Sequence, residues 1–451
     1  MPLRSPYDRE IARLAIPALG TLAAEPSYLL VDTAMVGHIG GPEAGQALAS
    51  LALAASVLAT LAGLGVVAAY ATTAAVARLA GASGADGRHA DDLRRIAAQS
   101  LWLGLALGAI GAVVAALAGP LWVGALGGQG ATADGAVRYL RISAPGLAFA
   151  LLSMAAQGWL RGTGDLRSPL LIVLVGNAVN LVLNPLLIFG VDLGLDGSAI
   201  ATLTGQTVMG LLFVRLLWRG SADPPGAAST TRRRPSLALL RRIGTTGGFL
   251  LVRSGALLLT FAVASAVAAR AGDPSLAAHQ IGWQLFVFIA LVLDALAIAG
   301  QVLIGRALGA ERTDEAFAAS SRMVLLTVAF GTLVAIVLLI ARDPILGLFT
   351  DVEAVRDRAR AMWPLLCLML PLAAAVFAFD GVLIGAGDAR FLAFAMTGAA
   401  VVGVPVLLVA QSAGWGIVGV WAGINVVIVA RLLGTGWRYR DRRWARTGAW
   451  R

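Results

Sequence analysis

Two carboxylates stand in an otherwise apolar stretch near the start of the chain, which reads EPSYLLVDTAMVG over residues 25–37. Glu25 and Asp32 are seven residues apart, or two helical turns, so a helix would carry both on one face. A carboxylate in a low-dielectric pocket has its charged form disfavoured, and it then exchanges a proton or attracts a cation. We therefore expect Asp32 and Glu25 to couple a cation. The alternative is that neighbouring helices satisfy both acids without further function.

Prolines accompany these acids. Pro26 follows Glu25 directly, and Pro17 lies closer to the N-terminus. Because proline lacks a backbone N–H, each one removes a helical hydrogen bond and favours a bend. We expect Pro17 and Pro26 to let this helix bend, although prolines also occur in membrane helices that do not move.

A second polar pattern lies in the stretch NAVNLVLNP. Its asparagines, Asn177, Asn180 and Asn184, are spaced three and four apart and so lie on one helix face. Thr202 stands in the next apolar stretch. Asparagines can join membrane helices without any role in transport. Their occurrence in the same half as Asp32 nevertheless favours a polar pocket.

The second half of the chain contains further polar candidates. Asp294 has Gln301 two turns later on the same face, and Gln284 lies nearer the opposite end of that stretch. Asp380 begins the sequence DGVLIGAGD, close to a helix end. Arg253 can pair with Asp294 or with Asp380. A buried pair of this kind would have a structural role, which is the alternative to a role in coupling.

Composition places these residues in a membrane. The chain of 451 residues is 58% hydrophobic and only 13% charged, whereas a soluble domain has roughly 25% charged residues. A charge at the bilayer centre costs at least about 2.5–3.5 kcal/mol, so the acids retained there are candidates for function. The net charge of +10 comes from arginines in short loops and at segment ends, and we therefore expect no nucleic-acid partner.

Several kinds of chemistry lack the residues that they need. The sequence contains no phosphate-binding loop, catalytic triad or paired metal motif. His38 and His279 are too few for a metal site, and the single Cys367 forms no intramolecular disulfide. We expect no enzyme, no catalytic residue, no bound metal and no cofactor. Because nothing in the chain would hydrolyse ATP, the energy for transport must come from an ion gradient.

Twelve stretches are long and apolar enough to cross a bilayer, for which about 20 residues suffice. The sequence therefore predicts an all-α polytopic membrane protein with twelve transmembrane helices in two pseudo-symmetric six-helix bundles. The predicted spans are residues 11–37, 46–77, 93–118, 136–160, 168–190, 196–218, 243–270, 276–307, 317–340, 355–385, 391–411 and 415–436.

The spans divide into two halves. The stretch 220–236 is rich in Pro, Gly, Ser and Thr and is predicted to be a cytoplasmic linker between bundles at 1–219 and 237–451. GWLRGTGDLR (158–167) and GVLIGAGDAR (381–390) share the spacing G-x-L-x-G-x-G-D-x-R, and ARLAGA resembles GRALGA at a similar offset. An even number of spans per half gives both copies the same orientation. Such repeats surround a central cavity in transporters.

Arginine positions predict the orientation. They concentrate in alternate loops and at the C-terminus, which places both termini in the cytoplasm of a multi-pass plasma-membrane protein. The loop after the ninth span is an exception, because it carries Arg342, Arg356, Arg358 and Arg360. It also carries acids, which offset this rule poorly.

Several motifs in order resemble the multidrug and toxic compound extrusion (MATE) family, in its DinF-like branch. They are EPSYLLVDTAMVGHIGG, GWLRGTGDLRSP, NAVNLVLNPLLIFG, GSAIATLTGQ and LDALAIAGQVLIGRALGA, and the resemblance covers essentially the whole chain. It implies a V-shaped pair of six-helix bundles that exports drugs or other organic cations, as small-molecule substrates, in exchange for H⁺ or Na⁺. We expect a monomer in the lipid bilayer.

The resemblance also implies roles for individual residues. Asp32 matches the family's coupling aspartate, Asn180 and Thr202 match its polar partners, and Pro17 matches the bending proline. The family often has an aspartate where this chain has Asn184, so a site with two carboxylates has only one here unless Glu25 substitutes. A flippase for lipids or lipid-linked oligosaccharides is the alternative function. It would favour a cavity lined by arginines.

Overall fold

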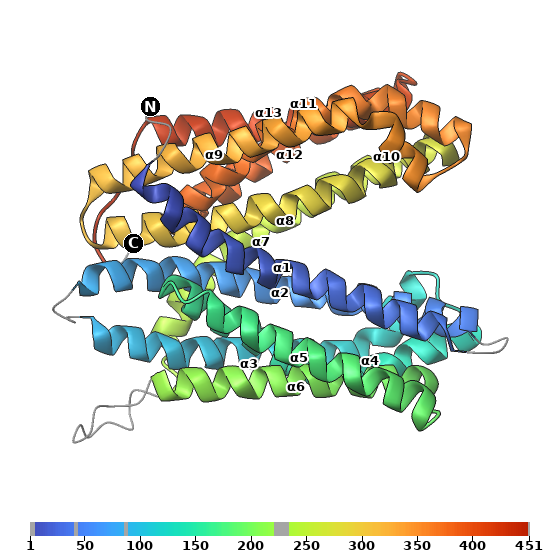
Figure 1. The fold of residues 1–451 in the computed structure, drawn as a ribbon, viewed down its shortest axis with the longest axis horizontal. Helices are drawn as coiled ribbons and strands as arrows, with labels where there is room; N and C mark the ends of the chain where they lie inside the picture. Colours follow the sequence, from blue (N-terminus) through green and yellow to red (C-terminus); the bar gives the residue numbers. More distant parts are fainter. Residues whose placement is uncertain (1–4, 40–43, 85–88, 221–233, 450–451) are drawn as a thin grey trace. The chain divides into compact units, whose positions relative to one another are not determined.

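The computed structural model describes residues 5–39, 44–84, 89–220 and 234–449 (Figure 1). Within these residues, twelve helices are long and apolar enough to cross a membrane, which confirms the predicted number. Helices are the expected solution, because a membrane-spanning helix satisfies its own backbone hydrogen bonds where no water is available.

The first six spans are α1 (Pro6–Gly37), α2 (Ala44–Ser83), α3 (Ala90–Ala125), α4 (Gly130–Gly162), α5 (Arg167–Pro185) and α6 (Gly194–Gly220). The remaining spans are α7 (Leu237–Arg270), α8 (Asp273–Gly309), α9 (Thr313–Ile340), α11 (Glu353–Gly385), α12 (Ala389–Ser412) and α13 (Gly416–Arg440).

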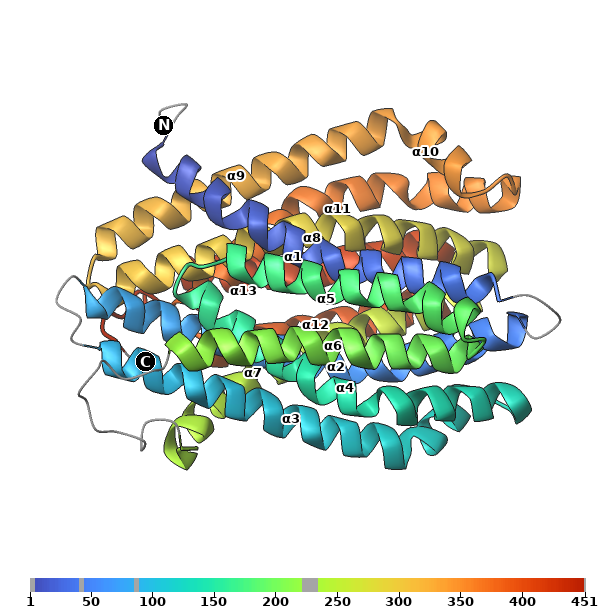
Figure 2. The ribbon, with the colours of Figure 1, turned by 60° about the horizontal axis from the view of Figure 1, so that its bottom comes forward.

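Two short elements were not predicted. A π-helical turn, η1 (Leu186–Gly190), extends α5 directly after Pro185. Proline cannot donate a backbone hydrogen bond, and a wider turn is one way for a helix to continue past it. The helix α10 (Arg342–Phe349) lies between α9 and α11 at one end of the bundle, as Figures 1 and 2 show.

The chain forms two compact units. One contains Gly20–Thr245, and the other contains Met1–Leu19 together with Thr246–Arg451. The helix α1 thus belongs to both, and the division falls after Leu19, two residues beyond Pro17. The predicted domain boundaries at 219 and 237 stay a prediction. Residues 221–233 of the predicted linker lie outside the described residues.

The unit Gly20–Thr245 is built around α4, which packs against α2, α3 and α6. Close approach to α3 depends on small residues. A Cβ on Gly104 would lie 2.5 Å from the Cα of Leu152, and one on Gly108 would lie 2.5 Å from the Cα of Ala148. Lipid tails are as apolar as the helix faces, so the hydrophobic effect does not drive transmembrane helices together. They associate instead through the close van der Waals packing that small residues allow.

The other unit repeats this plan around α11, which packs against α8, α9 and α13. The motif G-x-L-x-G-x-G-D-x-R, which begins in both α4 and α11, explains why the two units pack alike. Gly158 of α4 faces the carbonyl oxygen of Ala69 in α2, and a Cβ on Gly381 of α11 would lie 2.6 Å from the carbonyl oxygen of Ala297 in α8. The two halves therefore use equivalent glycines at equivalent helix contacts.

The ends of these central helices are also alike. Gly164 and Gly387 both have a φ of +74°, a backbone conformation that favours glycine. In each case the N–H of the following aspartate, Asp165 or Asp388, bonds a carbonyl of the preceding helix at 2.9 or 2.8 Å. The G-D pair of the repeated motif is thus a helix-ending turn.

The arginines of the exceptional loop are mostly paired. The Arg360 guanidinium bonds Asp343, Glu353 and Asp357, and Arg356 bonds Asp351. Hydrogen bonds from Arg342 and Arg360 hold the pKa of the Asp343 carboxyl below its usual range. Local acids therefore offset most of the positive charge at this end of α11.

Candidate functional site

Asp32 lies at the centre of a buried polar network in the unit Gly20–Thr245. Its side chain comes from α1 and is 1% exposed. One carboxylate oxygen, Oδ1, accepts two hydrogen bonds: from Asn184 Nδ2 of α5 at 2.8 Å and from Ser198 Oγ of α6 at 2.7 Å. Three helices thus meet at a single carboxylate oxygen.

The network continues away from Asp32 along α5. Asn184 Nδ2 also donates to Asn180 Oδ1 at 3.1 Å, and Asn180 Nδ2 donates to Thr202 Oγ1 at 3.4 Å. The Thr202 hydroxyl also lies 3.2 Å from the Tyr28 hydroxyl and 3.3 Å from the Tyr139 hydroxyl. Asn180 therefore reaches Asp32 through Asn184, which is one turn further along α5. Direct bonds from Asn180 and Thr202 to Asp32, which the family resemblance led us to expect, are absent among the described residues.

Two oxygen atoms of this network are buried without a hydrogen-bond partner in the described part of the chain. They are Oδ2 of Asp32 and Oδ1 of Asn184. Buried polar atoms are normally paired, and an unpaired one costs about 1–3 kcal/mol. Both atoms are acceptors, so a proton on Asp32 or a bound cation would satisfy them.

The charge balance around Asp32 is also unusual. Every partner given above is a neutral amide or hydroxyl group. Among the described residues, no arginine forms an ion pair with this carboxylate. A buried carboxylate without a counter-ion is costly, because burial disfavours the charged form. The site is therefore suited to neutralisation by a proton or by a small cation.

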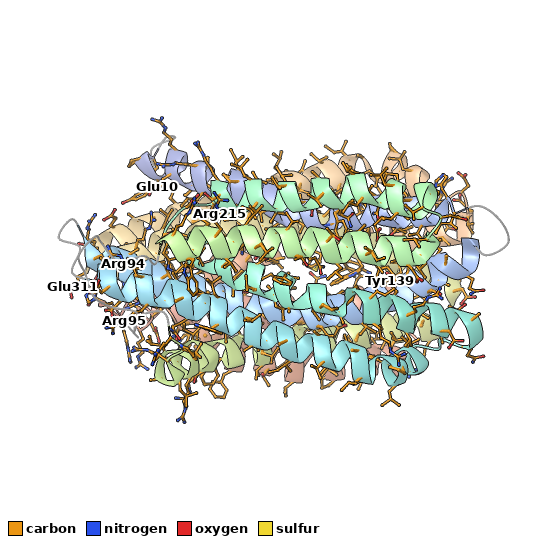
Figure 3. All side chains as sticks on the ribbon, turned by 90° about the horizontal axis from the view of Figure 1, so that it is seen from below. Glu10, Arg94, Arg95, Tyr139, Arg215 and Glu311 are labelled. Atoms are coloured by element: carbon orange, nitrogen blue, oxygen red, sulfur yellow. The ribbon has the colours of Figure 1, made fainter. Side chains whose placement is uncertain are left out.

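Figure 3 shows where the network lies within its unit. Tyr139 is far from the end that carries Arg94, Arg95 and Arg215. The polar network therefore occupies the half of the unit that is remote from its arginine-rich end.

The other first-half candidates have different surroundings. Pro17 and Pro26 both lie within the continuous helix α1. Asn177 donates to the carbonyl oxygen of Ala24 at 2.9 Å, which ties α5 to α1. The side chain of Glu25 lies outside the described residues, so its predicted role stays a prediction.

In the second unit, Asp380 lies between two arginines. Arg253 of α7 and Arg431 of α13 both donate to its Oδ2, the latter at 2.7 Å. All three side chains are at most 13% exposed. The structure thus contains the Arg253–Asp380 pair that was one of the two predicted possibilities, and Arg431 adds a second guanidinium.

The remaining candidates of this unit lie along α8. Asp294 is half-buried, and Gln284 is exposed. Gln301 is buried, and its Oε1 has no hydrogen-bond partner among the described residues. Its backbone carbonyl faces Gly385 of α11, so part of this helix face is occupied by the contact between α8 and α11.

Four residues of these clusters were not among the sequence candidates: Ser198, Tyr28, Tyr139 and Arg431. Spacing identifies two of them, since Ser198 precedes Thr202 by four residues and Tyr28 precedes Asp32 by four. Tyr139 and Arg431 come from α4 and α13, helices in which the sequence analysis named no candidate residue. No group of three or more His, Cys, Asp or Glu side chains within the described residues could hold a metal ion.

Comparisons with known proteins agree on one family. The MatE family model matches residues 17–186 and 251–409. The chain is 30% identical to the protein DETOXIFICATION 44, chloroplastic, of Arabidopsis thaliana, over 98% of this chain and 83% of the relative. It is 28% identical to DNA damage-inducible protein F of Escherichia coli, over 98% and 94% of the two chains.

Solved structures show the same fold. A transporter of the MOP superfamily from Pyrococcus furiosus superposes with a TM-score of 0.84 at 23% identity, covering 99% of this chain and 98% of that one. The fold, the family model and the relatives agree with the motifs in the sequence. The chain is a member of the multidrug and toxic compound extrusion (MATE) family of membrane transporters, in its DinF-like branch.

Proposed function

We propose that this protein is a secondary active antiporter that exports drugs or other organic, mostly cationic compounds in exchange for H⁺ or Na⁺ at Asp32. The observation that carries the proposal is the asymmetric environment of this carboxylate. Oδ1 accepts hydrogen bonds from the neutral side chains of Asn184 and Ser198, whereas Oδ2 is buried and has no hydrogen-bond partner among the described residues. The names of curated relatives support the kind of substrate, since one is multidrug and toxin extrusion protein 1 of Homo sapiens.

In the first step, Asp32 is ionised and attracts a cation. In the second, a proton on Oδ2, or Na⁺ between this oxygen and Asn184 Oδ1, removes the net negative charge and the attraction with it. Exchange follows only if the coupling ion and the substrate favour different states of the transporter. Because Asn184 and Ser198 hold Oδ1, neutralisation changes hydrogen bonds from α1 to both α5 and α6.

The helix α1 carries this change to the rest of the molecule. Its residues up to Leu19 group with one unit and those from Gly20 with the other. Pro17 lies two residues before this division, and its missing backbone hydrogen bond makes bending easier there. We propose that α1 bends near Pro17 when Asp32 binds or releases the coupling ion, H⁺ or Na⁺.

Transport in reconstituted vesicles tests the proposal. A fluorescent organic cation is loaded, and a proton gradient and a sodium gradient are imposed separately. One gradient should drive efflux in the wild type, and neither should drive it in Asp32→Asn. Substrate movement without either gradient in sealed vesicles would contradict the antiport mechanism. Headgroup exposure of a labelled phospholipid, measured in the same vesicles, tests the flippase alternative. The pairing of Arg253 and Arg431 with Asp380 does not favour that alternative.

We further propose a monomer in the plasma membrane with both termini in the cytoplasm. The arginine distribution supports the orientation of the termini. In the unit Gly20–Thr245, Arg94, Arg95 and Arg215 lie at one end (Figure 3).

A further inference from the structure

The repeated G-x-G-D-x-R motif ends in an arginine that the proposed transport cycle does not use. These arginines, Arg167 and Arg390, lie in the first turns of α5 and α12 and are exposed. The preceding part of the motif is explained by helix contacts and by the turn at Gly164 and Gly387. A terminal arginine in both copies therefore needs a separate explanation.

In each unit, this arginine lies level with an exposed tryptophan on the neighbouring antiparallel helix. A Cβ on Gly176 of α5 would lie 2.9 Å from the Cβ of Met209 in α6. Arg167 lies nine residues before Gly176, and Trp218 lies nine residues after Met209, so equal helical rise brings both to the same level. Nine residues are about two and a half helical turns, so both side chains lie on the faces of their helices that point away from the contact between α5 and α6. Trp218 is 39% exposed.

In the second unit, a direct contact between two aromatic rings shows that the arginine and the tryptophan are level. The rings of Phe391 in α12 and Trp437 in α13 have centroids 6.2 Å apart, which places Arg390 level with the end of α13. Trp437 is 59% exposed. The guanidinium of Arg390 lies 5.8 Å from the ring centroid of Phe394, which is 63% exposed.

Exposed apolar side chains continue each face toward the middle of the helices. They are Leu171 and Leu211 in one unit, and Phe394 and Leu433 in the other. Each helix pair therefore changes from exposed aliphatic or aromatic residues to a level that carries both tryptophan and arginine. Membrane proteins show this order where a helix passes from hydrocarbon to headgroups.

Nearby acids do not neutralise these arginines. Asp165 accepts hydrogen bonds from the N–H and hydroxyl of Ser168. Asp388 pairs with Arg438 at 2.7 Å, and Asp441 lies 3.5 Å from the same guanidinium. Further exposed arginines extend the positive charge: Arg215 and Arg219 at the end of α6, and Arg440, Arg442 and Arg443 at the end of α13 and just after it.

We propose that each motif arginine, which lies level with an exposed tryptophan, binds the headgroup of an anionic phospholipid. Arg167 forms one site, and Arg390 forms the other. The guanidinium binds the lipid phosphate, and the acyl chains lie along the apolar residues of the helix pair. The even number of spans per half predicts that both sites face the same leaflet. The inference does not depend on which substrate is exported.

Native mass spectrometry of the purified full-length protein with phosphatidylglycerol or phosphatidylcholine tests the proposal. The wild type should retain phosphatidylglycerol in preference to phosphatidylcholine. Arg167→Gln and Arg390→Gln should each weaken this retention about fivefold, as expected for one arginine at an anionic surface, and the double variant should lose the preference. Arg358→Gln is the matched control, because Arg358 is also exposed but lies near the start of α11, at the opposite end of its bundle.

Three results would overturn the proposal. The first is equal retention of phosphatidylglycerol and phosphatidylcholine by the wild type. The second is a double variant that keeps the wild-type preference. The third is an Arg358→Gln variant that loses this preference as fully as the double variant. Because the substituted side chains are exposed, folding should be unaffected, and a size-exclusion profile identical to that of the wild type checks this.

Discussion

Asn184 uses both hydrogens of its side-chain amide, one for Asp32 Oδ1 at 2.8 Å and one for Asn180 Oδ1 at 3.1 Å. An aspartate at this position could donate only when protonated, and then to only one of these oxygens. Asparagine makes both hydrogen bonds without taking up a proton. The departure from the family pattern at Asn184 is thus compatible with a complete hydrogen-bond network around a single acid.

Replacing the acid should abolish transport and leave the fold intact. In Asp32→Asn, the side chain keeps its shape but loses its negative charge, so it no longer attracts a cation. Cells that express this variant should lose resistance to an organic cationic drug, while membrane protein levels stay normal. Wild-type resistance in these cells would falsify the assignment of Asp32.

Removing the hydroxyl donor should weaken the network without removing the charge. Ser198→Ala leaves Oδ1 with Asn184 as its donor, and a hydrogen bond to a charged group contributes about 1.5–3 kcal/mol. We expect the apparent affinity for the coupling ion to change at least tenfold in vesicle transport. Ser153→Ala is the control, since Ser153 is equally buried but bonds only the carbonyl of Phe149 in its own helix. Similar kinetics for the two variants would contradict a special role for Ser198.

An acid in place of Asn184 should add a proton to the cycle. In Asn184→Asp, two carboxylates would face each other, and like charges in contact disfavour double ionisation. If the wild type is proton-coupled, the variant should move one more proton per substrate. The reversal potential of transport, measured at several imposed pH gradients, gives this ratio. An unchanged ratio in an active variant would show that position 184 does not take part in coupling.

The three-residue cluster of the second unit should act as a structural clamp. Asp380→Leu leaves Arg253 and Arg431 without their shared carboxylate, and removing one partner of a buried ion pair costs about 3–5 kcal/mol. We expect a large drop in thermal stability in detergent. Adding Arg253→Met and Arg431→Met to this variant should restore much of the loss, because apolar side chains replace the buried charges. If Asp380→Leu is as stable as the wild type but does not transport, Asp380 is part of the coupling machinery instead.

Close contact between α8 and α11 should depend on a glycine of the repeated motif. A Cβ at position 381 would lie 2.6 Å from the backbone carbonyl oxygen of Ala297, so Gly381→Ala requires the helices to separate. We expect a loss of about 1–3 kcal/mol, seen as a lower unfolding temperature. At Gly398 of α12, an added Cβ has no neighbour within 4 Å, so Gly398→Ala should not destabilise the protein. Equal effects at the two positions would contradict this packing.

The amino-acid sequence alone determined the number of spans and the internal repeat, and it located the acids within the apolar runs. Apolar runs of sufficient length form helices in lipid because their backbone has no other hydrogen-bond partner. A carboxylate such as Asp32 can be found in such a run by inspection. Spacing also placed Asn180 and Asn184 on one face of α5, since helical periodicity is a local property.

Only the tertiary structure decided which of these residues meet. Spacing fixes the face of a single helix but not the rotation of that helix against its neighbours. The sequence therefore could not show that Asn184 and Ser198, rather than Asn180 and Thr202, bond Asp32 directly. It also left open whether Arg253 pairs with Asp294 or with Asp380, and it gave no sign of Arg431. Such pairings join residues up to 166 positions apart, and they depend on how closely small residues let the helices approach.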